Sequence, residues 1–97
     1  MSVQELTFTA PLWLHDGGVW LLVTVPEDVS ADVRLFGGPP RGFGSVRVEV
    51  TVGRTTWRTS VFPDGPRFVL PVKKAVRTAE HIDVGDPLAI VLRVLGD

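Results

Sequence analysis

The side chains of this 97-residue chain that are best suited to bind a ligand are basic residues and tryptophans. Lys73, Lys74 and Arg77 stand together in the segment KKAVR, at the start of a predicted helix of about two turns. Lysines at a helix start oppose the helix dipole, and a local conflict of this kind often marks a functional position. Ammonium groups and free backbone amides converge there, so an anion can bind. A solvated helix with long basic side chains is the ordinary interpretation of the segment, and a surface site for an anionic ligand is the functional one.

Three further side chains are candidates for the same site. Arg58 lies on the outward side of a predicted strand. Trp13 falls on the polar side of its strand, and Trp20 stands opposite Leu21 in the alternation. Core packing is the alternative role for each tryptophan and the expected one for Trp57, because tryptophans are highly buried on average. The candidate ligand-binding residues are Lys73, Lys74, Arg77, Arg58, Trp13 and Trp20.

No constellation of residues points to conventional catalysis. The two histidines, His15 and His81, lack the spacing of metal ligands, and no serine stands in a G-x-S-x-G motif. The chain has no cysteine, which excludes a thiolate nucleophile, a cysteine-based zinc site and a disulfide framework. We therefore expect no catalytic residue, no metal and no cofactor. A small biosynthetic enzyme that works by shape and hydrogen bonding alone would leave no motif, and it is the first alternative to a binding module.

The net charge of −1 hides an uneven distribution. Residues 1–40 carry one basic and five acidic side chains, a net charge of −4, whereas residues 41–81 carry eight basic and three acidic ones, a net charge of +5. The basic middle segment makes nucleic-acid binding the second alternative, but acidic segments folded beside it would cancel much of its field. An anionic small molecule or a partner protein is therefore the expected partner, and nucleic acid is not.

The length predicts a single domain over residues 1–97, because the chain is too short for two independent cores. No signal peptide is recognisable, and no apolar run approaches the ~18 residues of a membrane span. Together with the lack of cysteine, these features predict a cytoplasmic protein without membrane contact. We expect a monomer or a weak homodimer.

The first part of the chain alternates between apolar and polar residues with the period of a strand. Leu6–Leu14 has this pattern, and Pro11 within it predicts an edge strand or a bulge, because proline cannot donate to a ladder. A turn with two glycines leads into a second strand, Val19–Val25, which is apolar on both faces and is expected to be central. Pro26 begins a short helix, and the glycine- and proline-rich connector over residues 37–44 ends it.

The strongest local signal is a hairpin around Gly53-Arg54. Four valines alternate over Val46–Val52, and Gly53-Arg54 is typical of a two-residue turn. Such a turn fixes the register, which places Trp57 on the inner face beside valines and pairs Glu49 with Arg58 on the outer face. The predicted pairs are Val52 with Thr55, Val50 with Trp57, Glu49 with Arg58, and Arg47 with Ser60.

The last third of the chain reads as strand, helix and strand. A turn at Pro63-Asp64-Gly65 precedes a strand whose inner side chains are Phe68, Leu70 and Val72. The helix spans Lys73–Glu80, and a corner at Val84–Pro87 leads into a final buried strand, Leu88–Val94, which is apolar on both faces apart from Arg93. On the helix, Ala75, Val76 and Ala79 are the predicted packed side, and Lys73, Lys74, Arg77 and Glu80 point outward.

Six short sequences, taken in order, resemble one known family. They are F-x-A-x-L-W (Phe8–Trp13), W-x-x-V-x-V-P (Trp20–Pro26), the valine-rich hairpin, the P-D-G turn, L-P-V-K-K-A-V-R (Leu70–Arg77) and V-G-D-P-L-A-I-V-L (Val84–Leu92). Together they look like a small bacterial domain-of-unknown-function family that occurs alone or ahead of the YdeI/OmpD-associated, bacteriocin-protection type domain. The most specific parts are K-K-A-V-R and G-D. The chain departs from the family pattern in its long connector and in lacking the second domain.

The resemblance implies a mainly β fold: a small closed double-split β-barrel of about six to seven strands with one or two short helices, related to the barrels of the AbrB and MazE transcription factors. A barrel of this size is filled by side chains, so any site is expected in a surface groove or at a barrel mouth. No reaction is implied by the family. The expected function is that of a non-catalytic binding or accessory module with a surface site for an anion or a small ligand.

Overall fold

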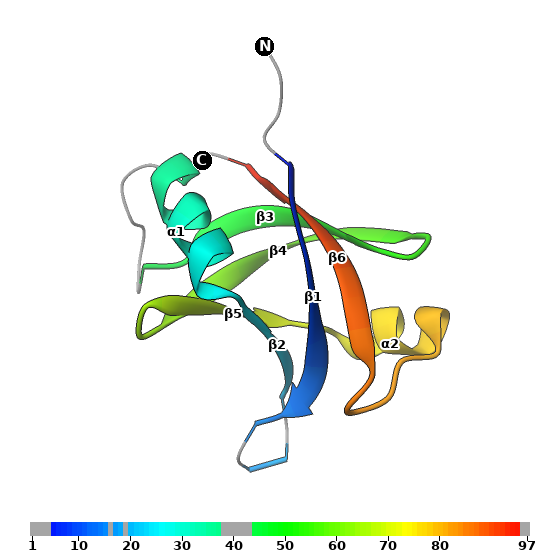
Figure 1. The fold of residues 1–97 in the computed structure, drawn as a ribbon. Coiled ribbons are helices and arrows are strands. Elements are labelled where there is room, and N and C mark those ends of the chain that lie inside the picture. The colour runs from blue at the N-terminus through cyan, green and yellow to red at the C-terminus, as the bar shows by residue number, and fades with distance from the viewer. Residues whose placement is uncertain (1–4, 16, 19, 38–43, 96–97) are drawn as a thin grey trace.

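Alternating apolar residues build a barrel that closes on itself (Figure 1). The computed structural model describes residues 5–15, 17–18, 20–37 and 44–95. Its elements are β1 (Glu5–Leu14), β2 (Leu21–Val25), α1 (Glu27–Phe36), β3 (Val46–Val52), β4 (Thr55–Asp64), β5 (Arg67–Pro71), α2 (Lys74–Glu80) and β6 (Pro87–Val94). The strands pair throughout in antiparallel fashion, which confirms the predicted fold class of a mainly β closed barrel with two short helices.

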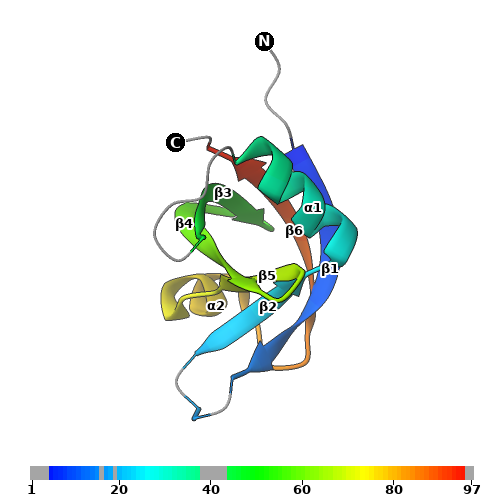
Figure 2. The same cartoon turned by 90° about the vertical axis from the view of Figure 1, so that its left-hand side faces the viewer.

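The two halves of the chain repeat the same order of elements, two strands, a helix and a strand. The strand order around the barrel is β1-β2-β5-β4-β3-β6, and it is unchanged when the halves are exchanged. The helices accordingly lie on opposite sides of the barrel in both views (Figures 1 and 2). The sequence shows no repeat that would have predicted this internal symmetry.

The core fills the barrel with side chains from alternate positions of every strand. Val48 and Val50 are fully buried, and Trp57 is 8% exposed, as the hairpin pattern predicted. Phe68 and Leu70 are also buried, which confirms them as the inner side of β5, and Val72 is buried just beyond the end of that strand. The remaining buried core residues are Ala10, Leu12, Val23, Val25, Val33, Val52, Val61, Val76, Ile82, Leu88, Ile90 and Leu92.

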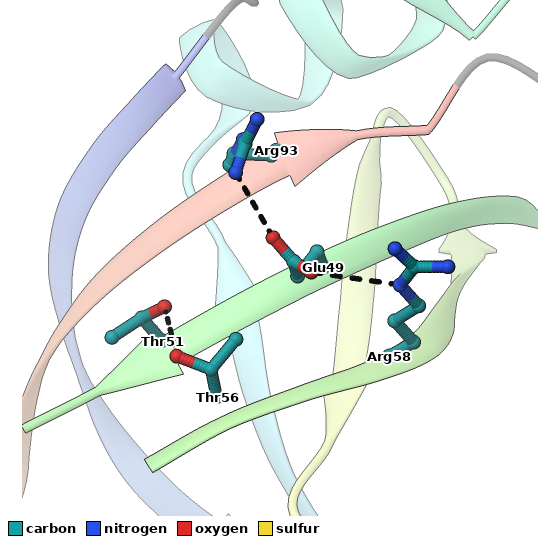
Figure 3. Close-up of polar contacts among 5 residues, drawn as sticks. All are labelled: Glu49, Thr51, Thr56, Arg58 and Arg93. Carbon is teal, nitrogen blue, oxygen red and sulfur yellow. Dashed lines mark hydrogen bonds and ion pairs between the residues drawn. The ribbon is translucent and has the colours of Figure 1, made fainter. Parts of the chain in front are cut away.

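The β3–β4 hairpin has the predicted register in all four predicted pairs. Its outer face carries a polar bridge across three strands, in which Glu49 of β3 lies between Arg58 of β4 and Arg93 of β6 (Figure 3). Arg93 Nη1 donates to Glu49 Oε1 at 3.1 Å, and Arg58 Nε donates to Glu49 Oε2 at 3.5 Å. The predicted ion pair of Glu49 with Arg58 is therefore present, and β6 supplies a second partner.

The expectation that Pro11 places β1 at an edge or on a bulge is met only locally, because β1 has a neighbour on each side of the closed barrel but is unpaired toward β2 at Pro11. β1 pairs with β6 over Glu5–Pro11 and with β2 over Leu12–Leu14, so its hydrogen-bonded neighbour changes from one side of the strand to the other. Pro11 stands at the change from one neighbour to the other. Proline is tolerated there because its missing N–H group would face β2, and the ladder with β2 extends only as far as Leu12.

Several predicted boundaries shift. β2 begins at Leu21, so Trp20 lies outside the strand, and Val19 and most of the connector, residues 38–43, lie outside the described residues. β4 continues through Pro63 to Asp64, because Asp64 still pairs with Arg67. The predicted turn at Pro63-Asp64-Gly65 therefore lies one to two residues later, after the strand has ended.

The second helix buries a different face from the predicted one. Val76 is buried as expected, but Ala75 and Ala79 are exposed, and Arg77 and Glu80 are partly buried. The reason is that Arg77 and Glu80 form hydrogen bonds with the barrel. β6 also differs from the prediction, since only one of its faces is buried and the side chains of the other face are exposed or partly buried.

Two gaps interrupt the pairing around the barrel, and a proline ends the ladder at each. The β1–β2 ladder stops at Leu12 opposite Val23, and the next position would require an N–H group from Pro11. The β4–β5 ladder stops at Phe62 opposite Val69, and the next hydrogen-bonded position, two residues on, would require an N–H group from Pro71. We call these the first gap and the second gap.

α1 contacts β1 and β5, and a buried serine holds it at the end of the β2–β5 ladder. Ser30 is fully buried, and its Oγ donates to the Val25 carbonyl and accepts from the Phe68 amide, each at 3.0 Å. The hydroxyl thus satisfies backbone groups at the end of the β2–β5 ladder, where Val25 lies opposite Phe68. Val33, one turn further along α1, is also fully buried.

Ser30→Ala is expected to destabilise the domain by about 1 to 3 kcal/mol, because it leaves a buried amide and a buried carbonyl without their partner. The higher helix propensity of alanine offsets only a part of this loss. Chemical unfolding monitored by circular dichroism measures the change. Asp32→Ala on the exposed side of the same helix is the control, with an expected change within about 0.5 kcal/mol. Equal stability of Ser30→Ala and the wild type would contradict this role.

Candidate functional site

The second gap is only partly covered, and a groove of about 380 Å³ lies there. One wall is β4, and the other is the start of β2 with the end of β5. The start of α2 borders the groove. Its lining residues are Trp20, Leu21, Trp57, Arg58, Thr59, Phe62, Pro71, Val72, Lys73 and Arg77.

Aromatic side chains make up much of the apolar surface of the groove. Trp20 is 59% exposed and Phe62 is 42% exposed, whereas Trp57 is 8% exposed and presents only a small part of its ring. Trp20 and Phe62 belong to the few large apolar side chains that the described residues leave exposed, and both line this groove. Their exposure gives the groove a surface that a planar ligand can cover.

Three basic side chains line the same groove, and no carboxylate is among the described residues that line it. Arg77 Nε donates to the Val72 carbonyl at 3.1 Å, which holds the guanidinium beside the groove wall. Arg58 has a side chain 66% exposed and shares Glu49 with Arg93. Lys73 is exposed and immediately precedes α2. The groove is therefore cationic and apolar at once.

The structure brings four of the six predicted site residues together, namely Trp20, Arg58, Lys73 and Arg77. Trp13 lies elsewhere, where its Nε1 donates to Thr24 Oγ1 at 2.9 Å and its ring stands 6.0 Å from that of His15. Lys74 lines a separate, open depression that it shares with Arg77 and His81. The two lysines at the helix start therefore lie on different surfaces, and only Lys73 lines the groove.

Sequence reasoning missed Phe62 and Pro71, and it gave core packing as the expected role of Trp57, which also lines the groove. The alternation along β4 contains a signal for Phe62, because it has the same outward parity as Arg58. Pro71 was also visible as a residue that ends a ladder. Its position opposite β4 could not be read from the sequence, because the turn at Gly65 that sets the β4–β5 register lies one to two residues later than predicted.

The side chains of the groove can bind an anion and an aromatic ring, but the described lining has no pair of residues for general acid and base catalysis. Thr59 is the one hydroxyl among the described lining residues, and no histidine or carboxylate accompanies it. His15 precedes β2 and His81 follows α2, so the two histidines lie on different turns. Within the part of the chain that the structure describes, no group of three or more His, Cys, Asp or Glu side chains is placed to hold a metal ion.

Neither described helix is long and apolar enough to cross a membrane.

Glu80 fixes the far end of α2 against the β3–β4 turn. Its Oε2 accepts from the Thr55 hydroxyl at 2.6 Å and from the Arg54 amide at 3.3 Å. Gly53, in the same turn, has a φ of +59° and lies so close that an added Cβ would overlap the Glu80 carboxylate. The turn therefore positions α2, and with it the basic residues at the groove.

Comparison with known proteins gives one family. The model of a domain of unknown function, DUF1905, matches residues 8–92, which include every residue that lines the groove. A search of curated proteins found no match.

Gly53→Ala is expected to destabilise the domain by at least about 1 kcal/mol more than Gly65→Ala. Both glycines have positive φ, so alanine has a similar backbone cost of roughly 1 to 2 kcal/mol at each. Only Gly53 faces Glu80; a Cβ at Gly65 meets nothing within 4 Å among the described residues. Chemical unfolding measures both variants. In a Glu80→Ala background the excess cost should vanish, and an undiminished excess would contradict the contact.

Proposed function

We propose that this chain, which belongs to the DUF1905 family of domains of unknown function, is a non-catalytic binding module whose ligand carries an aromatic group and an anionic group. The observation that carries the proposal is the groove at the second gap, where the exposed Trp20 lies on one surface with Arg58, Lys73 and Arg77.

The aromatic group is supported by the exposure of Trp20 and Phe62. Covering apolar surface contributes about 25 cal/mol per Å², so a ring laid on these side chains would gain affinity from burial. Aromatic pairs add about 0.5 to 1.5 kcal/mol beyond burial when the rings stack with an offset or meet edge to face. The groove thus favours a planar apolar group over a small inorganic ion.

The anionic group is supported by the charge of the groove. Arg58 is partly neutralised by Glu49, but no acidic residue of the described chain forms an ion pair with Lys73 or Arg77. A carboxylate or phosphate on the ligand would complement these two charges, and charge-assisted hydrogen bonds are the stronger kind. A cationic ligand would meet like charge from both.

Binding without catalysis is supported by the side chains that the groove lacks. General acid and base work needs a titratable group within hydrogen-bond reach of the reacting atom. The described lining offers two arginines, one lysine and one threonine for this purpose, with no histidine or carboxylate to activate the hydroxyl. This composition favours recognition over the biosynthetic enzyme considered above, and the open groove offers no enclosed reaction chamber.

The test is a titration with naphthoate, which joins an aromatic ring to a carboxylate, followed by NMR of the three indole Nε1–H groups. Trp20 and Trp57 line the groove, so their signals are expected to shift with one common affinity. The Trp13 indole is hydrogen-bonded to Thr24 outside the groove and serves as an internal control with no shift. Naphthylmethanol, which has the ring without the charge, is expected to bind about tenfold more weakly.

Two neighbouring lysines give a matched pair of variants. Lys73→Ala is expected to weaken naphthoate binding roughly threefold, since an exposed ion pair contributes up to about 1 kcal/mol. Lys74→Ala removes the same charge one residue away on another surface and is expected to leave the affinity unchanged. Equal losses in both variants, equal binding of the uncharged alcohol, or no shift at Trp20 and Trp57 would contradict the proposal.

A further inference from the structure

The edge of β4 at the second gap carries backbone groups that no strand of the described chain pairs with. β4 pairs with β5 only over Phe62–Asp64. Continuation of that register would place Ser60 opposite Pro71, which has no N–H group to donate. At the start of β4, α2 contacts the strand through Glu80, whose carboxylate accepts a hydrogen bond from the Thr55 hydroxyl. The stretch around Arg58 and Ser60 lies between these two contacts.

The register of the β3–β4 hairpin fixes which backbone groups point into the gap. Its two-residue turn makes Val52 and Thr55 a hydrogen-bonded pair, and such pairs recur at every second residue. Trp57 and Thr59 therefore bond to β3. The N–H and C=O groups of Arg58 and Ser60 point the opposite way, toward the second gap, as do those of Phe62, which pair with β5.

We propose that the groove binds an extended peptide segment, which adds to the free edge of β4 as an antiparallel strand and alternates between acidic and apolar residues. The inference deepens the proposed function, on which it rests for the anionic and aromatic character of the ligand. Strand addition to an exposed sheet edge is a general mode of peptide recognition, in which main-chain hydrogen bonds give affinity and alternate side chains give specificity.

The alternation follows from the two faces of β4. Arg58 points outward, so the peptide residue directly opposite it is acidic and lies on the same face. Trp57 and Thr59 point to the other face, so the peptide residues on either side of the acidic one are apolar, with an aromatic side chain placed beside Trp57. The antiparallel direction is that of every strand pair in the barrel.

Charge and edge geometry together favour a peptide over a second copy of this chain. The edge is bordered by Arg58, Lys73 and Arg77, so two copies placed edge to edge would bring like charges together. Exposed edges in natural proteins are commonly protected from self-pairing by charged side chains of this kind. An acidic peptide neutralises the same charges and uses the same backbone groups.

The experiment uses the blocked peptide acetyl-Val-Glu-Phe-Glu-Val-amide and two methylated forms of it. In an antiparallel pair, the residue opposite Arg58 donates its own N–H to β4, whereas its neighbours direct theirs away. N-methylation of both glutamates is therefore expected to lower the affinity about tenfold or more, through the loss of two main-chain hydrogen bonds. N-methylation of the phenylalanine and the following valine is expected to leave it nearly unchanged. Calorimetry gives the affinities, and amide NMR shifts at Arg58 and Ser60 locate the site.

Each other result overturns the inference. Equal effects of the two methylation patterns would show that the peptide binds through its side chains alone. Concentration-dependent dimerisation by sedimentation, with shifts at Arg58 and Ser60, would assign the edge to a second copy. If naphthoate binds but the peptide does not, this inference fails and the proposed function stands; if neither binds, both fail.

Discussion

The structure depends on a limitation of proline, which has no amide hydrogen to donate to a neighbouring strand. Pro11 ends the ladder between β1 and β2, and Pro71 ends the ladder between β4 and β5. A six-stranded barrel that would otherwise pair continuously is therefore open at two places. Each opening exposes backbone groups and core side chains, which another part of the chain or a ligand must satisfy or cover.

The two helices pack on the barrel to different extents. α1 has ten residues, and Ser30 satisfies the backbone groups at the end of the β2–β5 ladder from within the core. α2 has seven residues and is held at its far end by Glu80, so the second gap is covered only in part. The groove is what remains uncovered. Its apolar surface and its basic rim are thus consequences of a short helix beside an interrupted ladder.

Local pairing could be predicted from the sequence because its signals are local. The valines of Val46–Val52 and the two-residue turn at Gly53-Arg54 specify one register, since a shift by one residue would move Trp57 to the opposite face. The fold class followed from the same alternation along the whole chain and from the family resemblance. The contact of Glu49 with Arg58 followed from the register alone.

The groove could not be predicted in the same way, because it depends on which strands are neighbours. The basic segment and Trp20 were visible as candidates, but nothing local places Trp20 beside residues of β4. The helix face was misjudged for a related reason. Ala75 and Ala79 fit an apolar stripe, yet Arg77 and Glu80 take the inward positions because their partners, Val72 and Thr55, lie on the barrel. Only the closed structure reveals those partners.

The most direct test of this account is native-state hydrogen exchange along β4. If Pro71 leaves the edge of β4 unpaired at the second gap, the amides of Arg58 and Ser60 should exchange much faster than those of Trp57 and Thr59, which bond to β3. This alternation of fast and slow amides is the predicted result. Equal, strong protection of all four amides would show that the edge is already paired, and it would contradict the origin assigned here to the groove.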